Sequence, residues 1–419
     1  MKKLFLLSLG TLFLFSCQNK PPVENPSPEI PSVTPETKQP EPIVLSVSER
    51  GVASAVNSFG LKVFSSLFSG EQAQDLLFSP LSLSLDLTLC AGGANGETQA
   101  QILSSMGLGG ELEAAASYYQ TMVAGLESAD PYTQFTSANS VWVHNEYTPA
   151  VSFVDYAQSY FDASVQCRDL SVKEGFAEIN LWCKEKTGGK LDKIVDDSRN
   201  PDQAPAVLLL NALYFNGGWT DPFDQVQEAP FYGVDGECSA SFLVGKSNYG
   251  YLETESAQLV SIPYGCGLYM FVVAVPKEGV ALDDMSESLR EQDFFGLSTA
   301  DPVNVQIPEF ELSYSTNDAL IPALQACGIT DAFNAETADF SKLLEGNKPL
   351  FISKVLQKSV IRVDEKGTEA AAVTLIGVDA DDVGGHEIVE RTVVANRPFV
   401  FALVESSSRS ILFLGKKLL

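Results

Sequence analysis

The sequence predicts a mixed α+β fold, in which helices dominate the first third of the chain and strands of large antiparallel or mixed sheets dominate the rest. Two observations carry this prediction. Apolar residues recur at helical spacing near the start, at Val52, Val56, Phe59, Val63 and Leu67. Later runs are rich in β-branched and aromatic residues and are bounded by Gly or Pro, which is typical of strands.

The helical pattern predicts an amphipathic helix over residues 48–69. The stretch 177–195 also reads as a helix, and Gly188-Gly189 should stop it because glycine adopts left-handed dihedrals easily. The expected strands lie in five apolar runs, at residues 206–219, 267–276, 303–312, 397–405 and 411–419. Hydrophobic residues make up 45% of the 419-residue chain, which is enough for a sizeable core.

The first 45 residues predict export rather than a folded domain. Residues 1–16 combine two lysines with a short apolar run, as a signal peptide does. Cys17 follows directly and resembles the lipidated cysteine of a bacterial lipoprotein, the alternative being an ordinary signal peptide with an incidental Cys. Residues 17–45 hold eight of the 22 prolines and read as an extended linker. Residues 46–419 then form one domain, expected on the surface-facing or periplasmic side of a bacterial membrane.

The charge balance limits the partners. The formal net charge is −27, from 27 Lys and Arg against 54 Asp and Glu. Nucleic acid and anionic lipid both require a basic surface, so neither is expected as a partner. Membrane contact is therefore expected through the lipid anchor alone, and we expect a monomer.

Few residues could support catalysis or a cofactor. The chain has two histidines, His144 and His386, and neither accompanies a GxSxG nucleophile elbow. HExxH and GxGxxG are absent, and residues 240–247 miss a phosphate-binding loop because Ala240 stands where the first glycine belongs. These motifs therefore give no support for an enzyme, and no cofactor is expected.

Metal binding is not expected either. Six cysteines remain beyond Cys17, without a CxxC pair, so neither zinc nor a redox couple is indicated, and whether some form disulfides stays open. The aspartates at 379, 381 and 382 lack the spaced ligands and closing Glu of a calcium loop.

The segment DEKGTEAAAVTLIGVDADD, residues 364–382, combines features of a strand and of a loop. Every even-numbered residue from Thr368 to Ala380 is small or apolar, whereas the charges of Glu369, Asp379 and Asp381 fall on the odd-numbered face. The segment therefore suits a strand with one buried face, yet its acidic end suits an exposed loop. Either it is a plain edge strand followed by a loop, or it changes state.

Five motifs in order resemble the serpin family over residues 46–419. Residues 365–372 resemble the family's hinge, formed by Glu365, Gly367, Thr368, Glu369, Ala370, Ala371 and Ala372. Residues 78–82, with Ser79 and Ser82, resemble its shutter, and residues 211–219, with Asn211 and Trp219, resemble the strand that leads to its breach. Residues 396–399 and 413–416 resemble the C-terminal strands. Gln357 departs from the pattern, because many serpins have a shutter histidine there.

The resemblance implies a serpin fold with an exposed reactive-centre loop. It also implies inhibition of a serine, or a cysteine, endopeptidase. The protease would cut the loop, form an acyl-enzyme and be trapped when the loop enters the main sheet. The family's usual hinge length places the scissile bond at Asp381–Asp382, which predicts an Asp-directed protease. A register shift to Val378 or Ala380 would instead predict an elastase-like or subtilisin-like target. The alternative is a noninhibitory serpin that acts as a binding module, against which the uncharged hinge argues.

Overall fold

The computed structural model describes residues 39–70, 74–189, 193–195, 205–299, 301–316, 319–346, 348–355, 357–368 and 389–419. Residues 39–419 form one compact unit. Cys17, Glu369, Ala370, Ala371, Ala372, Asp381 and Asp382 lie outside the described residues. In the described part, no helix is long and apolar enough to cross a membrane.

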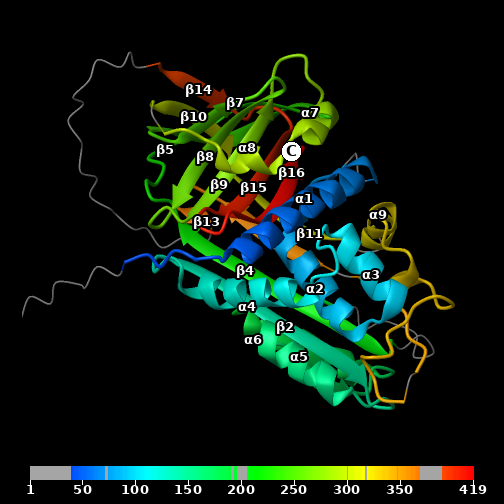
Figure 1. Ribbon diagram of the computed structural model, residues 1–419. Helices are drawn as coiled ribbons and strands as arrows, with labels where there is room; N and C mark the ends of the chain where they lie inside the picture. The colour runs from blue at the N-terminus through cyan, green and yellow to red at the C-terminus, as the bar shows by residue number, and fades with distance from the viewer. Residues whose placement is uncertain are drawn as a thin grey trace, which may run out of the picture. The chain divides into compact units, whose positions relative to one another are not determined.

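Helices fill the early part of the chain, as predicted, and cluster on one side of the ribbon in Figure 1. The described helices are α1 (Val47–Gly70), α2 (Pro80–Gly93), α3 (Gly96–Ser105), α4 (Leu112–Ser128), α5 (Val151–Phe161), α6 (Lys173–Lys186), α7 (Leu282–Ser288), α8 (Glu291–Phe295), α9 (Leu320–Ala326) and the short 3₁₀ helix η2 (Asp331–Phe333). Helix α6 begins earlier than predicted but stops before Gly188 and Gly189, whose positive φ angles of 59° and 84° turn the chain.

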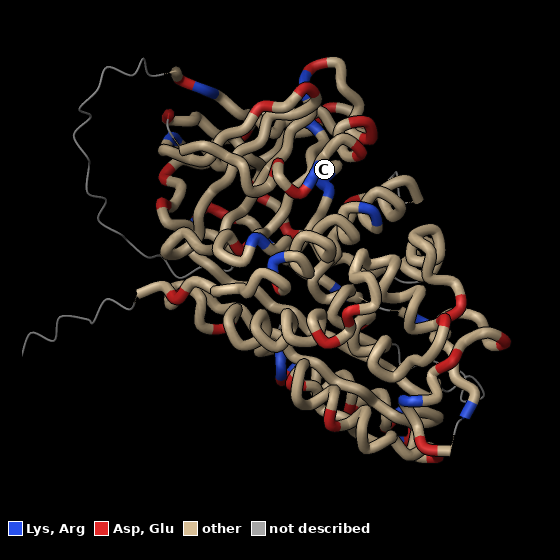
Figure 2. The backbone as a smooth tube through the Cα atoms, viewed as in Figure 1, with Lys and Arg blue, Asp and Glu red and all other residues tan. Residues whose placement is uncertain are grey.

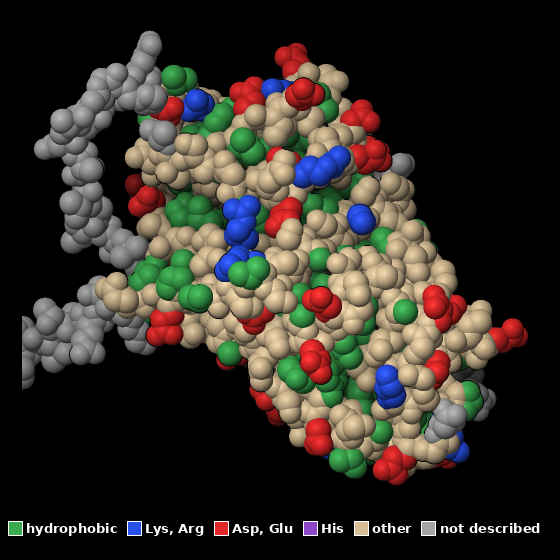
Figure 3. All heavy atoms as spheres, viewed as in Figure 1, with side chains coloured by type: hydrophobic (Ala, Val, Ile, Leu, Met, Phe, Trp, Pro, Cys, Tyr) green, Lys and Arg blue, Asp and Glu red, His purple; other side chains and the backbone are tan. Residues whose placement is uncertain are grey.

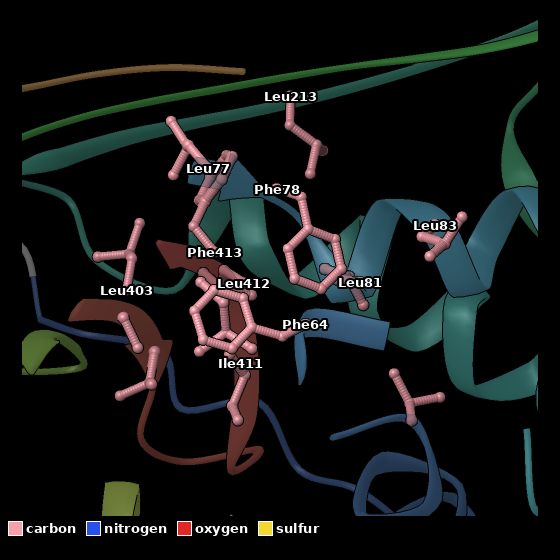
Figure 4. Close-up of a cluster of buried hydrophobic side chains, with 14 of the residues drawn as sticks. Phe64, Leu77, Phe78, Leu81, Leu83, Leu213, Leu403, Ile411, Leu412 and Phe413 are labelled. Carbon is pink, nitrogen blue, oxygen red and sulfur yellow. The ribbon is translucent and has the colours of Figure 1, made fainter. Parts of the chain in front are cut away.

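Helix α2 is apolar on nearly all sides, which marks a helix surrounded by protein. Ser79 caps its N-terminus by accepting a hydrogen bond of 3.0 Å from the backbone N–H of Ser82, and Pro80 occupies the first turn, where its missing N–H costs nothing. Phe64 of α1, Leu81 of α2 and Leu213 of a long strand meet in the core shown in Figure 4. The helix therefore forms the centre of the domain, beneath a sheet.

Four groups of strands form the described sheets. The largest has the order β1 (Leu76–Phe78), β16 (Ser410–Lys417), β15 (Phe399–Glu405), β9 (Tyr269–Pro276), β8 (Ala257–Tyr264) and β7 (Gly250–Glu253). A second has the order β14 (Arg391–Val394), β10 (Val303–Pro308), β6 (Gly236–Ser247) and β5 (Gln225–Gly233). The third has β13 (Gly367–Thr368), β4 (Val207–Gly218), β2 (Thr133–His144) and β3 (Ser164–Arg168). The fourth pairs β11 (Phe310–Ser315) with β12 (Lys358–Val363).

One strand prediction is wrong in detail. Residues 303–312 form two strands in different sheets rather than one, because β10 ends at Pro308 and β11 begins at Phe310. Proline has no backbone N–H to continue a ladder, so the chain leaves the sheet there. The other four predicted runs coincide with β4, β9, β15 and β16 to within a few residues at each end.

The surface agrees with the acidic composition. Asp and Glu positions occur along both the helical and the sheet regions of the backbone in Figure 2. The face drawn in Figure 3 is mainly uncharged, with scattered acidic and some basic side chains. Among the described residues, all six cysteines are free. No group of His, Cys, Asp and Glu side chains in the described ranges is arranged to hold a metal ion.

Candidate functional site: an unpaired gap between two strands

The site lies between β4 and β12. Strand β4 pairs on one side with β2 along eleven positions, and β12 pairs with β11 along six. No ladder between β4 and β12 is found in the described part of the chain, so the third and fourth sheets are separate. The edges of β4 and β12 therefore face each other across a gap without hydrogen-bonded pairing. Within the described ranges, β13 alone pairs with this edge of β4, at one end.

A tight turn leads from β12 into β13. The carboxylate of Asp364 accepts hydrogen bonds from the backbone N–H groups of Lys366 and Gly367, at 2.9 and 3.2 Å. Asp364 and Gly367 also form an antiparallel bridge. The chain thus reverses direction within four residues and places β13 against β4, with Gly367 opposite Gly218 and Thr368 opposite Gly217. The first residues of the predicted loop segment already form a strand.

Gly367 cannot be replaced without strain. Its φ angle is +144°, which residues with a side chain rarely adopt. A Cβ atom at this position would lie 2.1 Å from the carbonyl oxygen of Gly217. The hinge therefore requires glycine for both its backbone dihedral and its close approach to β4.

The hinge packs on a group of aromatic residues that we call the breach cluster: Trp219, Phe215, Phe223 and Tyr264, with Thr368. The rings of Trp219 and Tyr264 stack with centroids 4.3 Å apart. The Tyr264 hydroxyl lies 2.7 Å from that of Thr368, which is only 2% exposed. Burial raises the pKa of Tyr264 well above its ordinary value, so its hydroxyl stays neutral and can hydrogen-bond with Thr368.

Backbone hydrogen bonds hold the hinge to the same cluster. Trp219 donates from its backbone N–H to the carbonyl of Lys366 at 2.9 Å, and from its indole N–H to the carbonyl of Asp364, also at 2.9 Å. Phe223 donates to the carbonyl of Glu365 at 3.0 Å. Of the residues singled out from the sequence, the structure therefore brings Glu365, Gly367, Thr368 and Trp219 together. It adds Tyr264, which sequence reasoning missed.

A second cluster, the shutter cluster, connects both edges of the gap to α2. It comprises Ser79, Ser82, Asn139, Asn211, Thr316 and Gln357. Ser82 donates to the side-chain oxygen of Asn211 on β4 at 2.6 Å. Gln357, just before β12, accepts from the backbone N–H of Ser79 at 2.7 Å and donates to its carbonyl at 3.1 Å. Both edges of the gap are thus tied to one helix N-terminus, although not to each other.

The shutter cluster is buried and fully neutral. Asn211 donates to Asn139 on the paired strand β2, and Asn139 donates to the carbonyl of Phe161 at 2.7 Å. The backbone N–H of Gln357 donates to the hydroxyl of Thr316 at 3.1 Å. Gln357 therefore links the segment before β12 to Ser79 and to Thr316 by hydrogen bonds, without a titratable group. Asn139 and Thr316 had no signal in the sequence beyond being polar residues in apolar runs.

A cavity lies farther along the gap, beyond the shutter cluster. Leu83, Asp86, Leu87 and Cys90 of α2 form its floor, residues 205–209 at the start of β4 form one wall, and residues 350–355 before β12 form the other. The hollow is small, with a volume of about 70 Å³. Asp86 was not singled out from the sequence. One of its carboxylate oxygens, Oδ1, is covered and has no hydrogen-bond partner among the described residues.

These features describe a protein in which a short strand after a glycine turn pairs with one end of a strand edge that has no ladder to β12 among the described residues. The serpin (serine protease inhibitor) family model matches residues 54–418, and the chain belongs to the serpin family. It is 29% identical to an uncharacterized serpin-like protein of Methanosarcina mazei over 88% of each chain. It is 30% identical to the intracellular coagulation inhibitor 2 of Tachypleus tridentatus, covering 88% of this chain and 91% of that protein. Identity to the leukocyte elastase inhibitor of Bos taurus is also 30%, over 87% and 98%.

Solved structures agree with this assignment. The native state of Tengpin, a thermophilic serpin, superposes with a TM-score of 0.78 and 29% identity, covering 91% of this chain and 97% of that one. Its latent state superposes with a TM-score of 0.74, covering 89% and 99%. The predicted serpin fold is therefore confirmed.

Proposed function

We propose that the chain inhibits a serine or cysteine endopeptidase by trapping it as an acyl-enzyme while the cleaved loop enters the gap between β4 and β12. One observation carries this proposal: Thr368 is already buried and paired with β4 at one end of an otherwise unpaired gap. A strand that starts there has a free edge of β4 to continue along. The small, uncharged residues at 370 and 372 suit the buried face of such a strand.

The energy available suffices for the task. A new central strand adds backbone hydrogen bonds to β4 and to β12, each contributing about 0.5–1.5 kcal/mol net. About twenty such bonds would contribute on the order of 10–30 kcal/mol, which is comparable to or greater than the ~5–15 kcal/mol that keeps a typical protease folded. Insertion can therefore distort an attached protease, provided that it outpaces hydrolysis of the acyl-enzyme.

We further propose Asp381–Asp382 as the scissile bond and an Asp-directed protease as the target. The test is incubation of the purified protein with Asp-directed, elastase-like and subtilisin-like proteases, followed by denaturing electrophoresis and mass spectrometry of the released peptide. A detergent-stable complex and a peptide that begins at Asp382 are expected with the first class. A complex with another class would move the scissile bond, and cleavage without any complex would contradict inhibition.

A separate proposal concerns the location. We propose that Cys17 carries a lipid that anchors the exported domain, with residues 18–45 as a spacer; the Cys after a short apolar run supports this. In the native host, Cys17→Ser should move the protein from the membrane fraction to the soluble fraction. Substitution of Cys167, an exposed cysteine of the domain, serves as the matched control and should leave the membrane association unchanged.

A further inference from the structure

One face of α2 lines the cavity beyond the shutter cluster. The side chains that reach the cavity are those of Leu83, Asp86, Leu87 and Cys90. They recur at spacings of three and four residues, so they lie on the same side of the helix. Figure 4 shows Leu83 on this helix, set apart from the ring of Phe64 in the main core.

Asp86 is the one charged residue of α2. The hydroxyls of Ser84 and Thr88 donate to backbone carbonyls one turn earlier, each at 2.8 Å, and Ser82 donates to Asn211. By contrast, Oδ1 of Asp86 is covered and has no hydrogen-bond partner among the described residues. A covered carboxylate oxygen without a donor is costly, so this position favours a ligand that supplies one.

The walls around Asp86 are mainly apolar. They include Val207 and Leu209 on one side, Leu350, Ile352 and Val355 on the other, and Phe340 and Leu343. The other titratable side chains among the described lining residues are Cys90 on the same helix and Lys354 on the opposite wall. Burial raises the pKa of the Cys90 thiol, which therefore stays neutral. Burial alone raises the pKa of Asp86 to about 8, so Lys354 does not act as its ionic partner.

The size of the cavity limits what it can hold. Its volume is about 70 Å³. One water needs roughly 10–15 Å³ of such a space, so there is room for about five groups of the size of a water or a methylene. A ligand of this site is therefore a compact molecule with a short chain.

We propose that this cavity binds a small primary alkylammonium ion, with its ammonium group against Asp86 and its short alkyl chain along the apolar walls. A primary ammonium brings three N–H donors and a positive charge to a carboxylate oxygen that lacks a donor. The alkyl chain gains free energy by leaving water. An anion would meet the charge of Asp86, and a purely apolar ligand would leave the carboxylate without a donor. The site lies apart from the hinge and does not depend on the proposed inhibitory function.

The affinity should depend on pH in a defined direction. The carboxyl of Asp86 is protonated below about pH 8 and charged above it. A primary amine stays charged until the pH approaches about 10. The ion pair is therefore most available between these values. From pH 7 to pH 9 the affinity should rise about tenfold, because the charged fraction of Asp86 rises by about that factor.

The test measures binding of n-butylammonium to the folded protein by isothermal titration calorimetry. We expect one site with a Kd in the millimolar range at pH 9, as suits a ligand of five non-hydrogen atoms. Butan-1-ol has the same chain without the charge, and methylammonium has the charge without the chain. Each should bind at least about tenfold more weakly than n-butylammonium, since the site requires both features.

Three variants locate the ion. Asp86→Asn keeps the shape of the side chain and removes its charge, so n-butylammonium should bind at least about tenfold more weakly. Cys90→Leu leaves the carboxylate in place but adds bulk inside the cavity, and should also weaken the binding. Glu311→Gln removes an exposed carboxylate on β11 and should leave the affinity unchanged. Cooperative unfolding of each variant in urea shows beforehand that a loss of binding is not a loss of fold.

Several results would overturn the proposal. Equal affinities in the wild-type protein and Asp86→Asn, or at pH 7 and pH 9, would show that Asp86 is not the partner of the ammonium group. An unchanged affinity in Cys90→Leu would place the ion outside the cavity. Absence of binding by n-butylammonium at pH 9 would leave the cavity without this ligand class, and the proposed inhibition of a protease would stand unaffected.

Discussion

The two ends of the gap between β4 and β12 differ in how completely they are filled. At the breach cluster, Trp219 is fully buried, stacks on Tyr264 and uses both of its N–H groups to hold the hinge. At the other end, a cavity borders Asp86, whose Oδ1 has no partner among the described residues. At the breach cluster the polar groups are hydrogen-bonded, and the first two residues of a strand are already in place. The other end is hollow and carries a carboxylate oxygen without a hydrogen-bond partner among the described residues.

This difference bears on the proposed insertion, which requires a sheet that is stable and also accepts a strand. The end of the gap where the strand begins is well packed and hydrogen-bonded. The end where an inserted strand would finish is hollow. Substitutions at the breach cluster should therefore destabilise the protein or block insertion, whereas an apolar substitution at Asp86 should stabilise it. The four predictions below test this contrast.

The largest effect is expected from Thr368→Arg. Thr368 is 2% exposed and hydrogen-bonded to Tyr264, so arginine would place a charge on a face that must be buried. We expect inhibition to be lost and the protein to become a substrate that is cleaved without a covalent complex. Electrophoresis after reaction with the target protease measures this. Glu369→Arg is the matched control, since its side chain belongs to the opposite face, and equal loss in both variants would contradict the parity of the hinge.

Trp219→Ala should cost about 3–5 kcal/mol of unfolding free energy, because it removes a fully buried ring. It also removes the indole hydrogen bond to the carbonyl of Asp364 and weakens the backbone hydrogen bond to Lys366. Urea denaturation measures the change. Trp182→Ala removes a half-buried tryptophan outside the gap and should cost less. A larger loss in the control variant would contradict the special role of the breach cluster.

Asp86→Leu should raise the unfolding free energy by roughly 1–3 kcal/mol, since it replaces an unsatisfied buried polar group with an apolar one beside an apolar cavity. The raised pKa of Asp86 means that its charged form destabilises the folded state, and this penalty grows as the pH rises toward about 8 and disappears in acid. The gain should accordingly be larger at pH 8.5 than at pH 6 in urea denaturation. A loss of stability at both pH values would show that Asp86 has a partner it needs.

Tyr264→Phe should have the smallest effect, about 0.5–1.5 kcal/mol, because it removes one hydrogen bond and leaves the stacked ring in place. A double-mutant cycle with Thr368→Val isolates the hydrogen bond. The sum of the losses of unfolding free energy in the two single variants should exceed the loss in the double variant. Strict additivity would mean that the two hydroxyls do not interact.

Much of the fold could be predicted because the spacing of apolar residues along a segment indicates which of its side chains are buried. The runs that form β4, β9, β15 and β16 and the helix α1 were found from spacing and composition, and Gly188-Gly189 marked the end of α6. The split at Pro308 was missed because an apolar run does not show which sheet each half joins. Of the site, the hinge, Trp219 and the shutter residues could be named from motifs, whereas Tyr264, Asn139, Thr316 and Asp86 could not.

The sequence by itself determined that one face of residues 368–380 is small and apolar, and that the hinge has glycine where the backbone requires it. Those properties are local, so spacing and residue type suffice to reveal them. Only the tertiary structure decided that Thr368 meets Tyr264, that Ser79 and Ser82 tie both edges of the gap to one helix, and that Asp86 borders a cavity. These contacts join residues more than a hundred positions apart or depend on what surrounds a side chain, and packing alone brings such groups together.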